Sequence, residues 1–430
     1  MKKIFVFLFL LLFPTMSFAI VDTTKVSINE AVEIAQKNNL DIQSSRKNID
    51  IEKNSIQIAK RFQNPEVGVF YSLGKAGKGD PQQIGFNQIV EVAKRGVRKN
   101  LAESRYELAS KGVEYLEIDL KMDVREAYTN LLARKSILKT MQSQEELLKK
   151  MLEVAKEKDL KTAKVQEIDV LQAQLLLNQI ITEVTSARYN VKTALYEFNK
   201  VINCPDGFYD TKEESFTSDF HPFEIPKVDA VMPDFEKIST DAINNRADIK
   251  IALQAIDVAE KNLIVEMRKK VPDLELTAGY SYQNWSRTED HSFQHGSFLG
   301  AKLVNIPLFY SFEPEIKNAR IQLEQAHLNY ASVENKAMND LKKAYEKFLM
   351  AQSNLKTYNE QLLTSSEELI RASRKSYKAD KIDLTTLITM EESYRMVVIA
   401  HTNALADYYN AWNSFIREVN NEQFIIKEDV

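Results

Sequence analysis

The chain has 430 residues, of which 57 are Lys or Arg and 61 are Asp or Glu, so its formal net charge is -4. This balance argues against a nucleic-acid partner and against a strongly basic membrane-surface patch. Only 11 Gly and 10 Pro interrupt the chain, which predicts unusually long elements, and the single cysteine, Cys204, excludes an intramolecular disulfide.

The N-terminus has the pattern of a secretory signal peptide. A basic start and a short apolar run, "IFVFLFLLLF", precede the small-residue site Ser17-Phe18-Ala19. This order predicts that residues 1–19 are a signal peptide, cleaved after Ala19. The alternative, a membrane anchor, would need a longer apolar run, and no later stretch has the roughly 20 apolar residues of a transmembrane helix.

The rest of the sequence repeats itself. At an offset of 207, the following residues recur in pairs: Asn38/Asn245, Asp41/Asp248, Ile42/Ile249, Arg61/Arg268 and Pro65/Pro272. At an offset of 217, further pairs follow: Ala127/Ala344, Tyr128/Tyr345, Leu132/Leu349, Ala194/Ala411, Phe198/Phe415 and Asn203/Asn420. We therefore expect two structural repeats. The predicted units are a first repeat at 20–203, a linker at 204–233, a second repeat at 234–420 and a C-terminal tail at 421–430.

Each repeat is predicted to have the same elements in the same order. The first contains a helix at 28–62, a β-hairpin at 65–92, a long helix at 97–158 and a returning helix at 167–201. The second contains a helix at 235–269, a β-hairpin at 272–309, a long helix at 315–378 and a returning helix at 384–419. A helix of about 60 residues is roughly 90 Å long, so the molecule should be elongated. The last helix has coiled-coil spacing, which Glu391 and His401 interrupt.

The segment "KVPDLELTAGYSYQ", residues 270–283, alternates apolar and polar side chains. This is the period of a β-strand with different surroundings on its two faces. We expect Leu274 to Tyr282 to meet lipid, while Glu275 and Gln283 line water. Because lipid cannot satisfy an open sheet edge, and known single-chain barrels begin at about 8 strands, four strands need partner chains. The alternative is a pair of ordinary soluble hairpins packed on helices.

The sequence resembles the TolC-like outer-membrane efflux proteins over essentially all of the expected mature chain. The resemblance is carried by "SINEAVEIAQKNNLDIQSSRKNI", "NPEVGVFY", "NRADIKIALQAIDVAEKNL", "VPDLELTAGYSY" and "LVNIPLF". It implies a mainly α fold with a β-barrel portion. A homotrimer would form a 12-stranded β-barrel in the bacterial outer membrane, continued by a periplasmic α-helical barrel. It also implies two partners, a periplasmic adaptor (membrane fusion protein) and an inner-membrane pump.

The segment "QIVEVAKRG", residues 88–96, is similar to one in cobalt-zinc-cadmium-type efflux members, where a strand ends with Glu and Gly-Lys-Arg follows. Here Ala93 stands in place of the glycine, which is a departure from that pattern. The segment therefore has two interpretations, a subfamily signature for heavy-metal cations or a strand end followed by a basic, solvated turn.

The resemblance places a constriction at the helix turns farthest from the strands. By the family pattern, Gln166 and Asp383 cap the returning helices. The candidates for the constriction or gate are Asp169, Asp383, Thr386 and Glu167, with Asp169 as a lumen-facing acid and Thr386 at the matching position of the second repeat. Three such carboxylates around an axis would attract cations. Asp383 has a second interpretation, as a helix cap only.

Three residues before the second turn resemble the polar residues that latch neighbouring helices in closed family members: Arg374, Tyr377 and Lys378. The alternative is that each is a solvated side chain at a helix end. His291 and His295 have ligand-like spacing but fall in a predicted external loop, so no metal site and no cofactor are expected.

The sequence therefore predicts a passive exit duct of a tripartite efflux system rather than an enzyme. It has no phosphate loop, catalytic triad or zinc signature. Two other interpretations remain open. The first is the exit channel of a type I protein secretion system, and the second is a periplasmic adaptor, against which the duplication argues.

Overall fold

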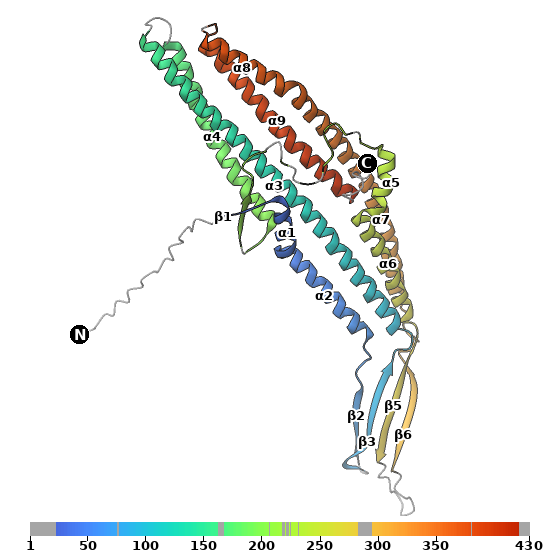
Figure 1. Ribbon diagram of the computed structural model, residues 1–430. Helices are drawn as coiled ribbons and strands as arrows, with labels where there is room; N and C mark the ends of the chain where they lie inside the picture. The colour runs from blue at the N-terminus through green and yellow to red at the C-terminus, as the bar shows by residue number, and fades with distance from the viewer. Residues whose placement is uncertain are drawn as a thin grey trace, which may run out of the picture.

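The computed structural model describes residues 23–74, 77–161, 167–205, 207–216, 220, 223, 225–230, 232–282, 295–379 and 381–420. The described chain is elongated, with a sheet at one end and the far ends of two long helical hairpins at the other (Figure 1). The signal peptide at 1–19, the tail at 421–430, the cap Gln166 and the loop residue His291 lie outside the described residues. In the described part of the chain, no helix is both long and apolar enough to cross a membrane.

Two helices replace the single helix predicted at 28–62. A capping box of Ser27 and Glu30 starts α1 (Ile28–Asn38), and α2 (Leu40–Lys60) follows. Asn39 separates them because its side chain accepts hydrogen bonds from the amides of Asp41 and Ile42, at 2.8 and 3.1 Å, and so caps α2. The prediction of one continuous helix was wrong. A break at a single residue leaves the hydrophobic period of the sequence almost unchanged, so the sequence pattern does not show it.

The helix predicted at 235–269 is also divided, into α5 (Phe235–Asn245) and α6 (Ala247–Arg268). Arg246 stands between them, 207 residues after Asn39. Its guanidinium is largely buried and pairs with Asp248 at 2.8 Å and with Glu418. Arg246 therefore holds the start of α6 against the end of the last helix.

Four antiparallel strands form one open sheet in the order β2-β3-β5-β6. They are β2 (Glu66–Gly74), β3 (Gly77–Val90), β5 (Asp273–Tyr282) and β6 (His295–Val304). The two predicted hairpins are thus neighbours, joined through β3 and β5. The second hairpin ends at Val304 rather than near 309, because Asn305 turns the chain with a left-handed φ of 57°.

At Gly279 the neighbouring strands leave no room for a side chain. A Cβ atom there would lie 2.3 Å from the carbonyl oxygen of Ile84 and 2.5 Å from the ring of Phe298. A side chain at this position would push the neighbouring strands apart. Glycine therefore allows Phe298 to cover the middle of the sheet.

The long helices form two antiparallel hairpins that lie side by side (Figure 1). The first pairs α3 (Arg95–Lys161) with α4 (Glu167–Ile202). The second pairs α9 (Leu384–Val419) with α7 (Glu313–Thr357) and α8 (Thr364–Lys378). A π-helical turn at Tyr358–Leu363, called the π turn below, joins α7 to α8, so the uniform helix predicted at 315–378 is wrong at this point.

Two separate hydrophobic clusters hold the helices together. The main cluster lies midway along the molecule and includes fully buried Tyr128, Phe198, Phe348, Trp412 and Phe415. The tip cluster lies toward the hairpin turns and includes Leu148, Ile180, Ile370, Leu384 and Leu387. Each cluster draws on both hairpins, so the two hairpins are packed together midway along the molecule and again near their turns.

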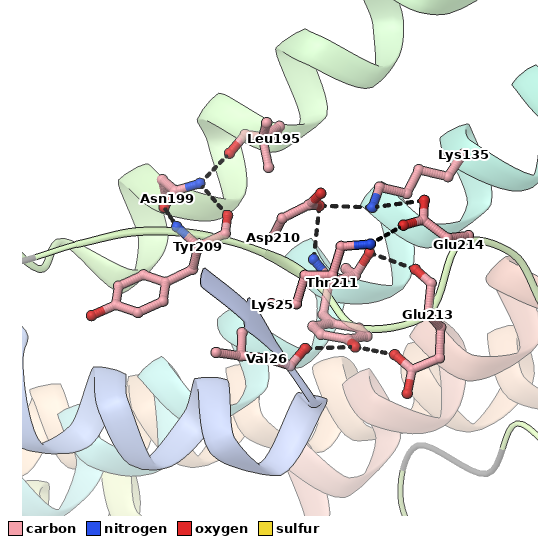
Figure 2. Close-up of polar contacts among 11 residues, drawn as sticks. Lys25, Val26, Lys135, Leu195, Asn199, Tyr209, Asp210, Thr211, Glu213 and Glu214 are labelled. Carbon is pink, nitrogen blue, oxygen red and sulfur yellow. Dashed lines mark hydrogen bonds and ion pairs between the residues drawn. The ribbon is translucent and has the colours of Figure 1, made fainter. Parts of the chain in front are cut away.

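The N-terminal segment pairs with the predicted linker beside the main cluster. β1 (Thr23–Val26) and β4 (Phe208–Thr211) form a two-stranded parallel sheet. Asn199 holds β4 against α4 by bonding both the amide and the carbonyl of Tyr209, at 2.7 and 2.8 Å (Figure 2). Lys135 of α3 pairs with Asp210 at 2.8 Å, so β4 is also fixed to the first long helix.

Candidate functional site

The predicted constriction lies at the hairpin turns, opposite the sheet (Figure 1). α3 ends at Lys161 and α4 begins at Glu167. The backbones of Glu167 and Asp169 therefore belong to the first turn of α4. Their side chains lie outside the described part of the chain. Asp169 as a lumen-facing acid therefore stays a prediction.

Asp383 and Thr386 form a helix cap. The Asp383 carboxylate accepts a hydrogen bond from the Thr386 amide at 3.0 Å and so caps α9. Hydrogen bonds from the side chain and backbone of Thr386 hold the pKa of Asp383 below its usual value. The capping interpretation of Asp383 is confirmed by this geometry, and a gating role for either residue stays a prediction.

Arg374 pairs with a buried carboxylate on the facing helix. Its Nε and Nη2 atoms donate to the two oxygens of Glu391, at 2.6 and 2.8 Å. Glu391 is only 1% exposed, and the paired geometry is the strongest form of such a contact. Hydrogen bonding to Glu391 raises the pKa of Arg374. Within one chain, Arg374 therefore joins α8 to α9 of its own hairpin.

The sequence analysis did not identify Glu391 as a site residue. A signal was present, because Glu391 interrupts the apolar seam of α9 at a position where a buried side chain is expected. A buried acid in a seam requires a cationic partner from the facing helix. Arg374 is that partner.

A basic groove runs along α8 beside this pair. It has a volume of about 460 Å³ and includes four cationic residues, Arg371, Arg374, Lys375 and Lys378. Tyr394 and Ile370 form its apolar part, and Glu367 contributes an acid. Lys378 is exposed, whereas Tyr377 is half-buried against the tip cluster. The latching role predicted for Tyr377 and Lys378 is not tested by these positions.

Two polar contacts connect α9 of the second hairpin to α4 of the first. Arg395 of α9 pairs with Glu183 of α4 at 2.5 Å, and the Arg395 side chain is only 11% exposed. Nearer the turns, the hydroxyl of Thr385 donates to the side-chain oxygen of Gln172. The sequence analysis missed both contacts because no local pattern pairs residues more than 200 positions apart. The two contacts hold α9 against α4 at two levels along the helices.

The segment at 88–96 has structural contacts where the sheet meets the helices. Glu91 pairs with Arg98 at 2.8 Å, and Lys94 pairs with the buried Asp273 at 2.7 Å. The guanidinium of Arg95 lies 4.0 Å from the centre of the Phe62 ring. The charged residues of this turn thus hold α2, α3 and β5 together. In the part of the chain that is described, no cluster of three His, Cys, Asp or Glu residues is placed to hold a metal.

Comparisons with known proteins agree with this architecture. Residues 238–414 match the family model described as outer membrane efflux protein. The chain is similar to a CusC structure from work on transmembrane channel formation, with a TM-score of 0.72, 15% identity, and coverage of 92% of this chain and 93% of CusC. The chain has the fold of the outer-membrane efflux channels.

Two further solved structures have the same fold. The VceC outer membrane protein of Vibrio cholerae gives a TM-score of 0.69 at 15% identity, covering 92% of this chain and 96% of VceC. The CmeC outer membrane channel of Campylobacter jejuni gives 0.69 at 14% identity, covering 91% and 85%. A search of curated proteins found no match.

The predicted TolC-like fold is therefore confirmed in its coarse form, as a mainly helical chain shaped like these channels. The described sheet is open and belongs to a single chain, so the 12-stranded barrel and the homotrimer stay predictions. The internal duplication also stays a prediction. The cobalt-zinc-cadmium subtype also stays a prediction, because none of these comparisons identifies it.

Proposed function

We propose that the protein is an outer-membrane exit duct, formed by three copies of this chain, that passively conducts substrates delivered by an inner-membrane pump through a periplasmic adaptor. The observation that carries the proposal is the open sheet. One of its faces is apolar and exposed, and its two edges, β2 and β6, have no partner strand among the described residues. The match to the outer membrane efflux protein family supports the same conclusion.

The apolar face extends over all four strands. Its exposed members are Val67 and Val69 on β2, Ile84 and Phe86 on β3, Leu276 on β5, and Leu299 and Leu303 on β6. Leu299 is 88% exposed in the single chain. Such a face is stable against lipid and costly in water, where it would bind other surfaces.

The opposite face carries most of the polar side chains, as a water-filled interior requires, and Phe70 and Phe298 also lie on it. Glu275 and Lys302 stand directly across from each other on β5 and β6 and pair at 2.9 Å. Thr277 and Ser281 follow on the same face of β5. Lipid on one side and water on the other explain why the alternation is so regular.

The open edges supply the argument for partner chains. Backbone groups at a lipid-exposed edge have no hydrogen-bond partner, and each unsatisfied group costs several kcal/mol, so a sheet in a membrane must close on itself. Four strands are too few to close, and three chains would supply the twelve strands of the predicted barrel. The 67-residue α3, about 100 Å long, is suited to a duct that extends well into the periplasm.

Selectivity at the inner end is proposed to come from Asp169, with one carboxylate from each chain facing the axis. Such a ring would attract cations and favour cationic cargo. Replacing Asp169 by Ala should then raise conductance and weaken block by divalent cations. Heavy-metal cations are the proposed cargo on the strength of the segment at 88–96 alone.

A pair of substitutions on one strand pair tests the membrane assignment. Leu299→Arg puts a charge on the apolar face, where an arginine near the middle of a bilayer costs about 2–4 kcal/mol. We expect loss of heat-sensitive trimers from outer-membrane fractions. The matched control is Thr277→Arg on the polar face, which should assemble normally. A wild-type protein recovered as a soluble monomer would contradict the proposal.

A further inference from the structure

The helix from Ala351 to Tyr377 contains one residue too many for a uniform α-helix. Of its buried and half-buried side chains, all but Gln352 and Ser376 form one series on the helix, which packs on α9: Ala351, Leu355, Tyr358, Leu363, Ser366, Ile370, Ser373 and Tyr377. Every step between them is three or four residues except the step of five from Tyr358 to Leu363. In a uniform α-helix, one extra residue would rotate everything beyond it by about 100°. The π turn absorbs that residue, so both parts of the helix face α9.

The π turn also lies in a gap between the two hydrophobic clusters. Leu355 is the last buried residue of the main cluster on this helix, and Ile370 is the first of the tip cluster. Residues 359–369 are all half-buried or exposed. Segments with few buried apolar contacts open at low free energy, so the packing is weakest where the helix is irregular.

Polar contacts replace the missing apolar ones around the turn. His401 of α9 donates from Nε2 to the side-chain oxygen of Asn359 at 2.8 Å. The hydroxyl of Ser366 donates to the carbonyl of Leu363 at 2.9 Å, and Thr364 donates to the carbonyl of Asn359 at 3.4 Å. The last two bonds satisfy backbone groups that the π turn leaves less well paired. His401–Asn359 is the contact that joins the turn to α9.

We propose that the π turn is a hinge, at which α8 and the turn of the second hairpin bend relative to α7, and that the His401–Asn359 hydrogen bond holds this hinge in the conformation described. The hinge itself rests on the helix geometry. Its consequence, movement of the second hairpin at the inner end of a duct, rests on the proposed function. The Arg374–Glu391 ion pair makes α8 move together with the N-terminal part of α9.

Removal of the extra residue is the sharpest test. Deletion of exposed Gln361 reduces the five-residue step to four, so a uniform α-helix keeps every seam residue toward α9. Spin labels at Met350 on α7 and Leu369 on α8, both exposed, report the bend in a Cys204→Ser background. We expect a broad distance distribution in the full-length protein and a narrow one after the deletion. Amide exchange over 358–366 should slow roughly tenfold.

Deletion of exposed Ser143 from α3 is the matched control. α3 has no extra residue at this level, so the deletion should rotate its seam and destabilise the first hairpin. If the Gln361 deletion destabilises the second hairpin in the same way, or leaves the distance distribution and the exchange unchanged, the hinge is refuted.

Two further variants test the hydrogen bond between His401 and Asn359. Asn359→Ala should broaden the distance distribution further, whereas Asn354→Ala, at an exposed position on α7, should not. Equal effects of the two would refute the role of His401–Asn359. Conductance recordings separate the two proposals. A hinge that responds as expected in a protein without conductance would overturn the proposed function alone, and a conducting protein with a rigid helix would overturn the hinge alone.

Discussion

In the first hairpin α3 runs through 67 residues without interruption, whereas the matching helix of the second hairpin contains the π turn. Along α3, buried residues continue between the two hydrophobic clusters, at Ile137 and Gln144. Along the second hairpin the same interval holds no buried residue between Leu355 and Ile370. Two hairpins of one topology thus differ in where they are free to bend.

The returning helices show the same difference in single residues. By the predicted repeat offset of 217, the counterpart of His401 on α9 is Val184 on α4, which is 2% exposed and belongs to the tip cluster. A valine closes the seam of the first hairpin where a histidine interrupts that of the second. Polar residues in a helical seam lower its stability and make its register specific. The first hairpin is therefore expected to be the stiffer of the two.

The largest effect on this comparison should come from Arg374→Ala. It leaves the carboxylate of Glu391 buried without a partner, at an expected cost of about 2 kcal/mol. This is less than for a fully buried pair, because the Arg374 side chain is 48% exposed. Amide exchange should accelerate in α8 and in the start of α9, and not in α3 and α4.

The matched control for that variant is Arg371→Ala, at an exposed position of the same helix. It should leave exchange unchanged. Replacing both Arg374 and Glu391 by Met should restore most of the protection, because an apolar pair removes the buried charge. Equal losses for Arg371→Ala and Arg374→Ala would contradict the role assigned to the ion pair.

Substitutions at Val184 and at His401 should each loosen the hairpin in which they are made. Val184→His buries an imidazole in the tip cluster of the first hairpin and should cost about 1–2 kcal/mol. His401→Val removes the hydrogen bond to Asn359 and should speed amide exchange in the second hairpin around the π turn, as Asn359→Ala does. Hydrogen exchange of both variants, compared helix by helix, measures the effect. The comparison fails if Val184→His leaves the first hairpin as protected as before.

Acidification should loosen only the second hairpin. Burial lowers the pKa of His401 below its usual 6.5, so the folded state favours the neutral imidazole. The unfolded state then binds more protons, and the stability that neutral His401 contributes is lost as pH falls through its folded pKa, below 6.5. Protection around the π turn, corrected for intrinsic exchange, should fall in that range, and His401→Val should abolish the dependence.

The smallest effect should come from the cap of α9. Asp383→Ala removes the acceptor for the Thr386 amide and should fray only the first turn, whereas Asp383→Asn should keep the cap. Because hydrogen bonding lowers the pKa of Asp383, its contribution is present at neutral pH and is lost as pH falls through that lowered value, below 3.8. Amide exchange of the first residues of α9 measures both. Fraying by Asp383→Asn equal to that by Asp383→Ala would contradict the cap.

Sequence reasoning succeeded where a feature depends on nearby residues. The hairpins and the long helices follow from local periods, the cap Asp383 follows from the family resemblance, and the structure has them. The breaks at Asn39 and Arg246 were missed because they leave the hydrophobic period almost unchanged. The pairs Arg374–Glu391 and Arg395–Glu183 needed knowledge of which helices face each other, which no single helix contains.

Recording of single-channel conductance in planar lipid bilayers, with wild-type trimers and with Arg395→Ala, tests the central claim most directly. Arg395 of α9 pairs with Glu183 of the first hairpin, so its loss should loosen the hold of the first hairpin on the one that carries the hinge. The account predicts discrete conductance steps from the wild type and larger steps from Arg395→Ala. An absence of conductance in both, or equal steps in the two proteins, would contradict it.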